Sequence, residues 1–169
     1  MNSYMDVSRT ESYKQICDRI KLAGHSLYKD GYERIVFTNG CFDLMHPGHI
    51  STLKTARNCA GPHGAVVVGL NSDESIKRLK GGNRPILDCD ARAMMVLSIR
   101  FVDYVIAFDE DTPLELIKEL YPTIIVKGGD YKISEVVGND VAMIVSAAYD
   151  DRFSTTKLIQ KIVGDKCEF

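Results

Sequence analysis

The sequence lacks several features that would assign it to a special class of protein. It has 21 basic and 23 acidic residues, so the formal net charge is −2 and positive charge is not in excess. That balance argues against a nucleic-acid partner or an anionic membrane surface as the binding target. No apolar run reaches the roughly 18 residues that span a bilayer, so we expect no membrane partner either.

Cysteine pairs with a recognisable spacing are also missing. The five cysteines are Cys17, Cys41, Cys59, Cys89 and Cys167, an odd number with no C-x-x-C spacing. This pattern fits neither a disulfide framework nor a zinc site, and it favours free thiols in a reducing compartment. The first residues lack a basic start followed by an apolar core, so we expect no signal peptide and a cytoplasmic location.

The chain is long enough for one domain with its own core, since it has 169 residues of which 45% are hydrophobic. No internal repeat, low-complexity tract or linker divides it. We expect an N-terminal helical extension over residues 1–30, with a helix from about Glu11 to Ala23. Residues 31–169 would then form the single folded domain.

Strand and helix patterns alternate along this domain. Apolar runs predict strands at Arg34–Thr38, Ala65–Leu70, Val102–Phe108, Thr123–Val126 and Val141–Ala147. Helical patterns occupy Pro47–Ala60, Asp90–Ile99, Pro113–Leu120 and Thr155–Val163. The alternation predicts an α/β fold with a doubly wound parallel sheet covered on both faces. In such a sheet, ligands bind at the carboxyl ends of the strands.

The most informative segment runs from Thr38 to His49, directly after the first predicted strand. It contains a glycine turn, two histidines three residues apart and Pro47, whose fixed φ suits the first position of a helix. His46 would then occupy the N-cap position, and His49 would lie in the first turn on the same side. Backbone N–H groups and the helix dipole favour phosphate there. Two alternatives are weaker: one histidine lies on the surface while the other caps the helix, or the pair forms a His-x-x-His metal site. We expect no metal site, because only Asp43 offers a nearby third ligand.

Polar residues follow other predicted strands and should meet at the same edge of the sheet. They are Asn71-Ser72-Asp73, Lys127-Gly128-Gly129-Asp130-Tyr131 and, before the last helix, Ser154-Thr155-Thr156. Three consecutive hydroxyls exceed what a helix cap needs, which favours phosphate contact over capping alone. A long basic loop between Asp73 and Asp90 carries Lys80 and Arg84, and it either closes over a triphosphate or is a solvated run of charge.

Three charged residues have ordinary structural alternatives. Asp73 could cap a helix over Glu74–Leu79. Arg92 could face solvent at the start of its helix. Asp130 could accept hydrogen bonds from ribose or fill a turn position, where aspartate is common.

Together these motifs resemble a known superfamily. Asn39-Gly40-Cys41-Phe42-Asp43 with His46-Pro47-Gly48-His49, and the later Ser154-Thr155-Thr156, are similar to the two signatures of the cytidylyltransferase-like nucleotidyltransferases. Within that superfamily the chain most resembles the heptose 1-phosphate adenylyltransferases. The branch resemblance rests on Thr38–His49, Asn71-Ser72-Asp73, Lys80-Gly81, Arg84-Pro85, Arg100-Phe101-Val102-Asp103 and Val126-Lys127-Gly128-Gly129-Asp130-Tyr131.

The resemblance implies a Rossmann-like fold that transfers AMP from ATP to a sugar 1-phosphate, with Mg²⁺ as cofactor and a homodimer or higher homo-oligomer as the assembly. It implies catalytic roles for His46, His49, Lys80 and Arg92. Nucleotide contacts would come from Thr38, Asn39, Gly40, Cys41, Phe42, Gly48, Lys127, Gly128, Asp130, Ser154, Thr155 and Thr156. Substrate contacts would come from Asp43, Asn71, Asp73 and Arg84, with Asp43 and Asp73 orienting substrate or metal.

Two departures from the branch pattern bear on the acceptor. No sugar-kinase half accompanies the chain, so we expect a stand-alone adenylyltransferase. The stretch from Asn139 to Phe153 is shorter than the usual pattern, which leaves the acceptor sugar open. A CTP-dependent transferase for a polyol or amino-alcohol phosphate, and a non-catalytic nucleotide-binding protein, are the alternative functions.

Overall fold

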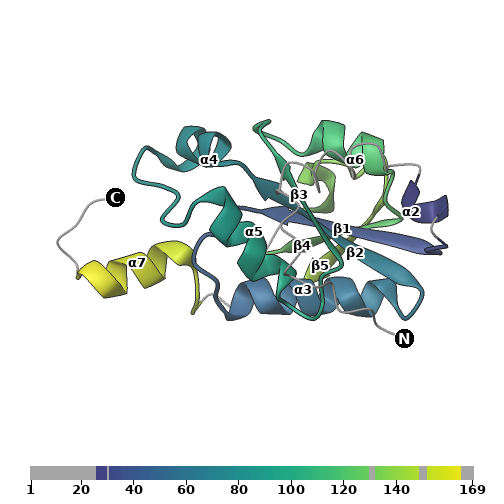
Figure 1. Ribbon diagram of the computed structural model, residues 1–169, viewed down its shortest axis with the longest axis horizontal. Coiled ribbons are helices and arrows are strands. Elements are labelled where there is room, and N and C mark those ends of the chain that lie inside the picture. The colour runs from purple at the N-terminus through teal and green to yellow at the C-terminus, as the bar shows by residue number, and fades with distance from the viewer. Residues whose placement is uncertain (1–25, 30, 130–131, 149–151, 165–169) are drawn as a thin grey trace.

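The protein is described by a computed structural model covering residues 26–29, 31–129, 132–148 and 152–164. The helix expected over Glu11–Ala23 lies outside these residues. Five parallel strands form one sheet in the order β3-β2-β1-β4-β5 (Figure 1). The strands are β1 (Arg34–Gly40), β2 (Gly64–Asn71), β3 (Tyr104–Phe108), β4 (Ile124–Gly128) and β5 (Met143–Ala147). The predicted α/β class and parallel sheet are confirmed.

Burial of β2 explains why its sequence reads as one apolar run. Every residue of the strand is buried, because it lies between two other strands with helices covering both faces of the sheet. Side chains alternate between the faces in β1, where Val36 belongs to one core cluster while Ile35 and Phe37 belong to the other.

Helices cover the sheet in two layers (Figure 1). On one face α3 (Pro47–Ala60) and α5 (Cys89–Leu97) pack over β1 and β2. On the other face lie α2 (Ser26–Lys29) and α6 (Leu114–Leu120), whose Leu27, Leu116 and Ile117 enter the second core cluster. Leu27 belongs to the expected N-terminal extension, so the core already begins within that segment.

Three further helical elements complete the described chain. They are α4 (Asp73–Lys80), the 3₁₀ helix η1 (Ile133–Glu135) and α7 (Thr155–Val163). The α4 helix occupies much of the segment expected to be a long loop, leaving eight residues before α5 begins. Its N-cap is Ser72, which accepts a hydrogen bond from the Ser75 amide, whereas Asp73 is already helical. Figure 1 shows α7 extending away from the body beyond the carboxyl ends of the strands.

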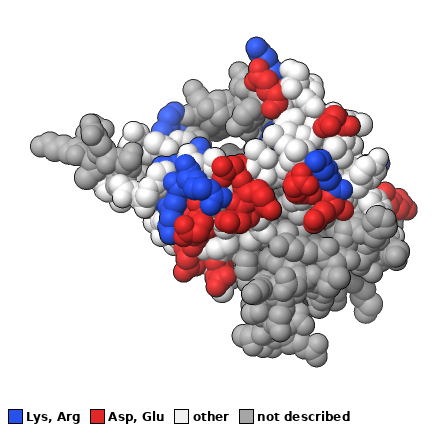
Figure 2. Space-filling view, turned by 90° about the horizontal axis from the view of Figure 1, so that it is seen from above, with Lys and Arg blue, Asp and Glu red and all other residues white. Residues whose placement is uncertain are grey.

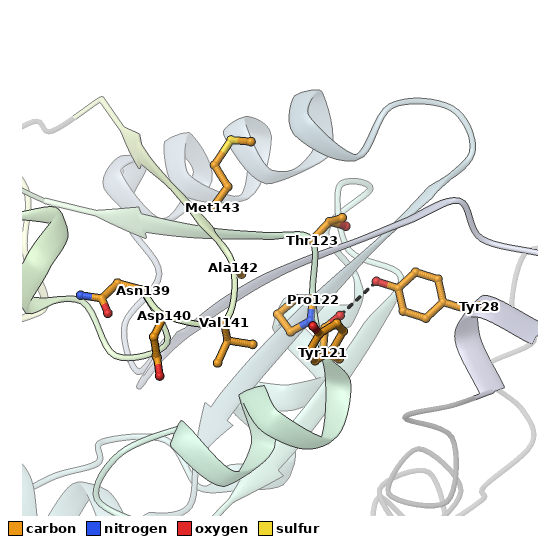
Figure 3. Close-up of a pocket in the computed structure, with 9 residues that line it drawn as sticks. All are labelled: Tyr28, Tyr121, Pro122, Thr123, Asn139, Asp140, Val141, Ala142 and Met143. Carbon is orange, nitrogen blue, oxygen red and sulfur yellow. Dashed lines mark hydrogen bonds between the residues drawn. The ribbon is translucent and has the colours of Figure 1, made fainter.

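The two ends of the sheet differ in character. At the carboxyl end, the chain order reverses between β1 and β4, which is the switch point where ligands bind in open α/β sheets. At the amino end, a groove of about 330 Å³ opens beside Tyr28, whose hydroxyl donates to the Tyr121 carbonyl at 3.0 Å (Figure 3). The groove therefore lies at the opposite end of the strands from the predicted phosphate site.

Charges on the surface are mixed. Figure 2 shows acidic and basic side chains next to one another on the face seen from above. Exposed ion pairs of the described residues include Arg78 with Asp111 at 2.8 Å and Lys118 with Glu115 at 2.8 Å. Among the residues that the structure describes, no helix is both long and apolar enough to cross a membrane.

Candidate nucleotide-binding site

The turn between β1 and α3 forms the centre of the candidate site. Phe42 adopts a positive φ of 45°, so the chain bends sharply soon after the strand ends. His46 occupies the N-cap of α3 with an extended backbone, and Pro47 is the first helical residue. Both predicted positions are confirmed. The first amide groups of α3 therefore lie next to the two histidines, where an anion is favoured.

The two imidazole rings form a stack. The ring centroids of His46 and His49 are 3.8 Å apart, and the ring planes differ by 28°. Phe42 packs against the other side of His49, at 4.9 Å between centroids. Gly48 has no side chain to interfere, and a Cβ there would lie 3.0 Å from His46 Cε1. The histidine pair is thus held in one arrangement by its neighbours.

Both histidines favour the neutral form. Burial, together with the neighbouring His46, lowers the pKa of His49 to about 3, and Asp43 opposes this only in part. Burial also lowers the pKa of His46. The Nδ1 atoms of both rings are buried without a hydrogen-bond partner in the described part of the chain. A neutral ring that carries its proton on Nε2 leaves Nδ1 as a bare acceptor, and it keeps its N–H donor free for a ligand.

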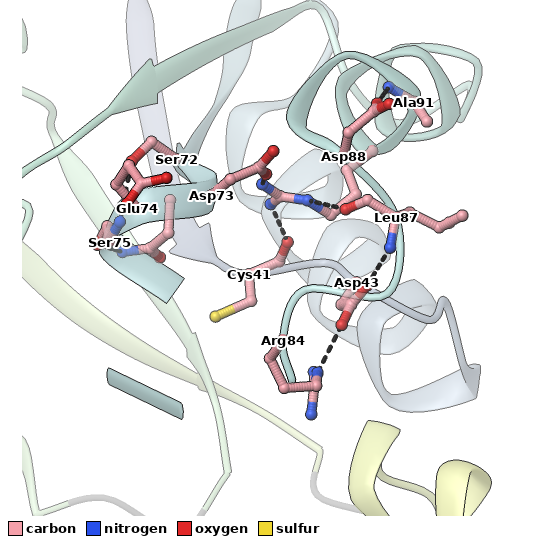
Figure 4. Close-up of polar contacts among 12 residues, drawn as sticks. Cys41, Asp43, Ser72, Asp73, Glu74, Ser75, Arg84, Leu87, Asp88 and Ala91 are labelled. Atoms are coloured by element: carbon pink, nitrogen blue, oxygen red, sulfur yellow. Dashed lines mark hydrogen bonds and ion pairs between the residues drawn. The ribbon is translucent and has the colours of Figure 1, made fainter. Parts of the chain in front are cut away.

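Asp43 anchors the segment that follows α4. Its carboxylate has no exposed surface; it pairs with Arg84 Nε at 2.6 Å and accepts from the amides of Ile86 and Leu87 at 2.9 and 3.0 Å (Figure 4). Asp43 makes these contacts because a buried carboxylate needs partners within the protein. The expected substrate-binding roles of Asp43 and Arg84 stay predictions.

Arg92 is fully buried, in contrast to the solvent-facing alternative. Its guanidinium donates to the carbonyls of Leu87 and Cys41 at 2.9 and 2.6 Å and to Asp73 Oδ1 at 2.6 Å. Figure 4 shows Asp73, Cys41 and Leu87 converging on this position. With its donors engaged in this way, Arg92 joins the starts of α4 and α5 to the turn after β1. Asp73 is its counter-ion, and the expected catalytic role of Arg92 stays a prediction.

Two predicted site residues, near the ends of β1 and β2, lie in the protein interior. Thr38 and Asn71 are buried, and the Asn71 side-chain amide donates to Ser75 Oγ at 3.0 Å. Cys41 is partly exposed, and burial raises the pKa of its thiol although Lys80, Arg92 and Arg84 act in the opposite direction. Lys80 itself lies at the exposed C-terminal end of α4, close enough for its charge to act on Cys41.

Lys127 and Asn39 meet at the switch point. Lys127 Nζ, on β4, donates to Asn39 Oδ1, on β1, at 2.6 Å. Burial lowers the pKa of the Lys127 ammonium. The next residue, Gly128, lies against α3, since a Cβ there would be 2.4 Å from Thr52 Oγ1. Asp130, the predicted ribose contact, lies outside the described residues.

The start of α7 reaches the same end of the sheet. Thr155 Oγ1 donates to the Leu44 carbonyl at 3.3 Å, which places the hydroxyl cluster beside the turn that carries the histidines. Ser154 caps α7 by accepting from the Lys157 amide at 3.1 Å, and Thr156 is exposed. The capping interpretation therefore holds for Ser154, while the segment as a whole lies where phosphate contact was predicted.

A hollow beside His46 was not foreseen. It has a volume of about 440 Å³ and is lined by Met45, His46, Pro47 and Ile50. The signal in the sequence was slight, because two apolar residues next to a histidine motif are equally typical of a helix packed in a core.

No metal centre is built from the described side chains. Among residues 26–29, 31–129, 132–148 and 152–164, no three His, Cys, Asp or Glu residues are grouped so as to hold a metal ion. Asp43 and Asp73, the carboxylates expected to orient substrate or metal, are paired with Arg84 and Arg92. Any Mg²⁺ at this site would therefore depend on phosphate oxygens of a bound nucleotide for its main ligands.

Comparison with protein families decides the assignment. The Cytidylyltransferase-like family model matches residues 37–161, which include the histidine motif and the hydroxyl cluster. The chain belongs to the cytidylyltransferase-like family. The resemblance of its two signature motifs is thereby confirmed, and so is the Rossmann-like architecture that it implied.

Relatives and a solved structure agree with this assignment. The chain is 46% identical over 154 residues to "Bifunctional protein HldE" of Nitratiruptor sp., covering 90% of this chain and 32% of that protein. It is 50% identical over 141 residues to the protein of the same name from Campylobacter jejuni, covering 83% of this chain and 30% of that protein. The chain thus spans about a third of these relatives. A lipopolysaccharide core biosynthesis protein from Thermoplasma volcanium has a similar structure, with a TM-score of 0.59, 27% identity, and coverage of 70% of this chain and 98% of that one.

Proposed function

We propose that this chain transfers AMP from ATP to a sugar 1-phosphate, with heptose 1-phosphate as the acceptor, and releases pyrophosphate. The observation that carries the proposal is the stacked pair His46–His49 at the start of α3, with the hydroxyl cluster of α7 beside it. The similarity to the bifunctional HldE proteins, over about a third of their length, supports the choice of a sugar phosphate as acceptor.

The reaction needs no nucleophile from the protein. A phosphate oxygen of the acceptor attacks the α-phosphorus of ATP, forming the new P–O bond, while the bond from that phosphorus to the bridging oxygen of pyrophosphate breaks. The electron pair of the broken bond leaves with pyrophosphate. The protein's contribution is therefore to position the two phosphates and to stabilise the charge that develops on the leaving group.

His46 and His49 would supply that stabilisation. Because both rings are neutral and their Nδ1 atoms are orphaned, each would offer an Nε2–H group to the oxygens of the leaving pyrophosphate. The Gly48 amide at the start of α3 would add a backbone donor, and the exposed Thr156 would add a hydroxyl donor from α7. Since the stack is already packed between Phe42 and Gly48, little reorganisation would accompany the reaction.

The remaining expected residues would have separate roles. Lys80, at the exposed end of α4, would add positive charge to the triphosphate. Arg92 and Asp43 would act through the turn that they hold. Mg²⁺ would be bound with ATP and would supply further neutralisation of phosphate charge. A cytoplasmic location and a homodimer or higher assembly remain predictions.

The test is to mix the purified protein with ATP or CTP and heptose 1-phosphate, and to measure pyrophosphate release. We expect release with ATP and heptose 1-phosphate together, and none when either is omitted. Release with CTP alone among the nucleotides would overturn the adenylyl assignment. No release with either nucleotide and a panel of sugar, polyol and amino-alcohol phosphates would favour a non-catalytic nucleotide-binding protein.

A further inference from the structure

Lys127 holds a position that the mechanism above does not use. In the pairing of β1 with β4, Phe37 lies opposite Ile125, and Asn39 and Lys127 each follow two residues later. The two side chains meet across the gap between these strands, with Nζ 2.6 Å from Oδ1. The gap is the switch point of the sheet, so the ammonium group lies on the floor of the crevice where a ligand is expected.

The positive charge of Lys127 lacks the carboxylate partner that each of the two arginines of the site has. Arg84 pairs with Asp43, and Arg92 pairs with Asp73. Lys127 is partly buried and donates to a neutral amide oxygen, and within the described ranges no carboxylate forms an ion pair with it. A buried cation without a counter-ion costs free energy, and the arrival of an anionic ligand would offset that cost. Burial lowers the pKa of the ammonium, which is consistent with this imbalance.

The end of β4 lies next to the helix that carries the histidines. Gly128 packs against Thr52, whose hydroxyl donates to the Gly48 carbonyl at 3.1 Å. Thr52 follows His49 by three residues, so both lie on the same side of α3. A Cβ at position 128 would collide with Thr52 Oγ1, and glycine thus permits the close approach of β4 to α3. Lys127 and the histidine pair therefore belong to the same crevice but enter it from different elements.

We infer that Lys127, positioned by Asn39, binds the phosphate group of the acceptor and holds it for attack on the α-phosphorus. The inference rests on the proposed function. In-line displacement requires the attacking and leaving oxygens to lie on opposite sides of the α-phosphorus. The starts of α3 and α7 supply donors for the leaving pyrophosphate. The attacking phosphate is also anionic and approaches a polyanion, so it needs a separate cation, and Lys127 provides one from the floor of the crevice.

The decisive comparison is between Lys127→Met and Lys118→Met. Lys118 is an exposed lysine of α6 whose partner is Glu115, so its replacement controls for the loss of one positive charge. Initial rates of pyrophosphate release give kcat and the KM for ATP and for heptose 1-phosphate, and calorimetric titration gives the affinity for ATP alone. For Lys127→Met we expect the KM for heptose 1-phosphate to rise about tenfold or more, with ATP affinity within about twofold of wild type.

A second variant addresses the pair itself. Asn39→Asp keeps the shape of the side chain but places a carboxylate beside the ammonium, so it should compete with the acceptor phosphate and raise the same KM. Thermal unfolding verifies that both variants fold, and Lys127→Met should be no less stable than wild type, because it replaces a buried charge with an apolar chain.

Three results separate the possible conclusions. An unchanged KM for heptose 1-phosphate in Lys127→Met would overturn the inference while leaving the proposed function intact. If Lys127→Met lowered the affinity for ATP by the same factor as it raised the KM for heptose 1-phosphate, Lys127 would bind the nucleotide instead. If the wild-type protein released no pyrophosphate, the proposed function would fail. Titration with inorganic phosphate would then test whether Lys127 forms a phosphate subsite. Loss of phosphate binding in Lys127→Met would support the subsite, and binding equal to that of wild type would overturn it.

Discussion

His46 and His49 stack with their ring centroids 3.8 Å apart, although two residues separate them in the sequence and only His49 lies within the helix. The stack forms because His46, at the N-cap, has an extended backbone that turns its ring back over Gly48 towards the first turn. Two neutral imidazoles can stand this close, whereas two imidazolium ions would repel each other. On the proposed function, phosphate recognition by this pair would depend on hydrogen-bond donors that packing holds in place.

Removing either ring should slow the transfer step. We expect His46→Ala or His49→Ala to lower kcat by roughly 10²-fold or more, because loss of one donor to a developing charge costs about 2.7–4 kcal/mol of transition-state stabilisation. Pyrophosphate release under saturating substrates measures the effect. His63→Ala, at an exposed position, is the matched control and should retain wild-type kcat. Equal rates in all three variants would refute the assigned site.

Gly48 should be sensitive for a steric reason. In Gly48→Ala the new Cβ would lie 3.0 Å from His46 Cε1 and 3.1 Å from Nδ1, so the ring must shift. We expect kcat to fall by about tenfold or more, since small displacements of catalytic groups are costly. The free energy of unfolding should change little, because alanine is the better helix former by about 1 kcal/mol and this gain offsets the cost of moving the ring.

Gly82→Ala provides the control for this glycine, since an added Cβ would have no neighbour within 4 Å. Its kcat should match wild type, and urea unfolding of both variants reports stability. A Gly48→Ala protein with normal kcat would mean that the exact placement of the His46 ring does not matter.

Acid should destabilise the protein through His49. Because its pKa is about 3 in the folded state and about 6.5 when unfolded, the unfolded chain binds the extra proton between these values. The free energy of unfolding should therefore fall as the pH decreases from about 6.5, by up to about 1.4 kcal/mol per pH unit for this group. Denaturant unfolding from pH 4.5 to 8, compared with His49→Gln, measures the contribution. A His49→Gln protein with the same dependence on pH as wild type would contradict it.

Replacing Arg92 should lower the stability of the fold more than it affects catalysis directly. Arg92→Met leaves Asp73 without its counter-ion and the carbonyls of Cys41 and Leu87 without a donor, so we expect a loss of about 3 kcal/mol in the free energy of unfolding. Urea unfolding measures it. Arg100→Met, at an exposed position, should lose less than about 1 kcal/mol. A stable Arg92→Met protein with sharply reduced kcat would instead favour direct contact with the substrate.

Much of the fold follows from pattern and spacing. The helices Pro47–Ala60 and Thr155–Val163 begin and end where the sequence predicts, because Pro47 and Ser154 are strong start signals. Strand ends were less accurate: β1 continues to Gly40, two residues beyond the prediction, since its register with β2 extends through Asn39 and Gly40. Pairing of this kind depends on a partner strand and leaves little mark on the strand itself.

The structure brings the histidine motif and the hydroxyl cluster together as the sequence predicts, but the contacts of the charged side chains around them were not predicted. The histidine motif and the hydroxyl cluster can be recognised from the spacing of neighbouring residues in the sequence. The engagement of Arg84 with Asp43 and of Arg92 with Asp73 depends on contacts 41 and 19 residues apart, which no local pattern encodes. An arginine at the start of a helix reads equally as solvent-facing, catalytic or buried, and only the tertiary environment separates these possibilities.

The hydrogen bond from Thr155 to Leu44 spans 111 residues of the chain. A growing polypeptide would present the histidine turn before α7 has emerged from the ribosome. On the proposed mechanism, a nascent chain could form the sheet and the stacked imidazoles while still lacking the hydroxyl cluster of α7. The chain would then become able to catalyse the reaction only after α7 has folded onto the histidine turn. On this view α7 determines when activity first appears during synthesis, in addition to forming part of the binding site.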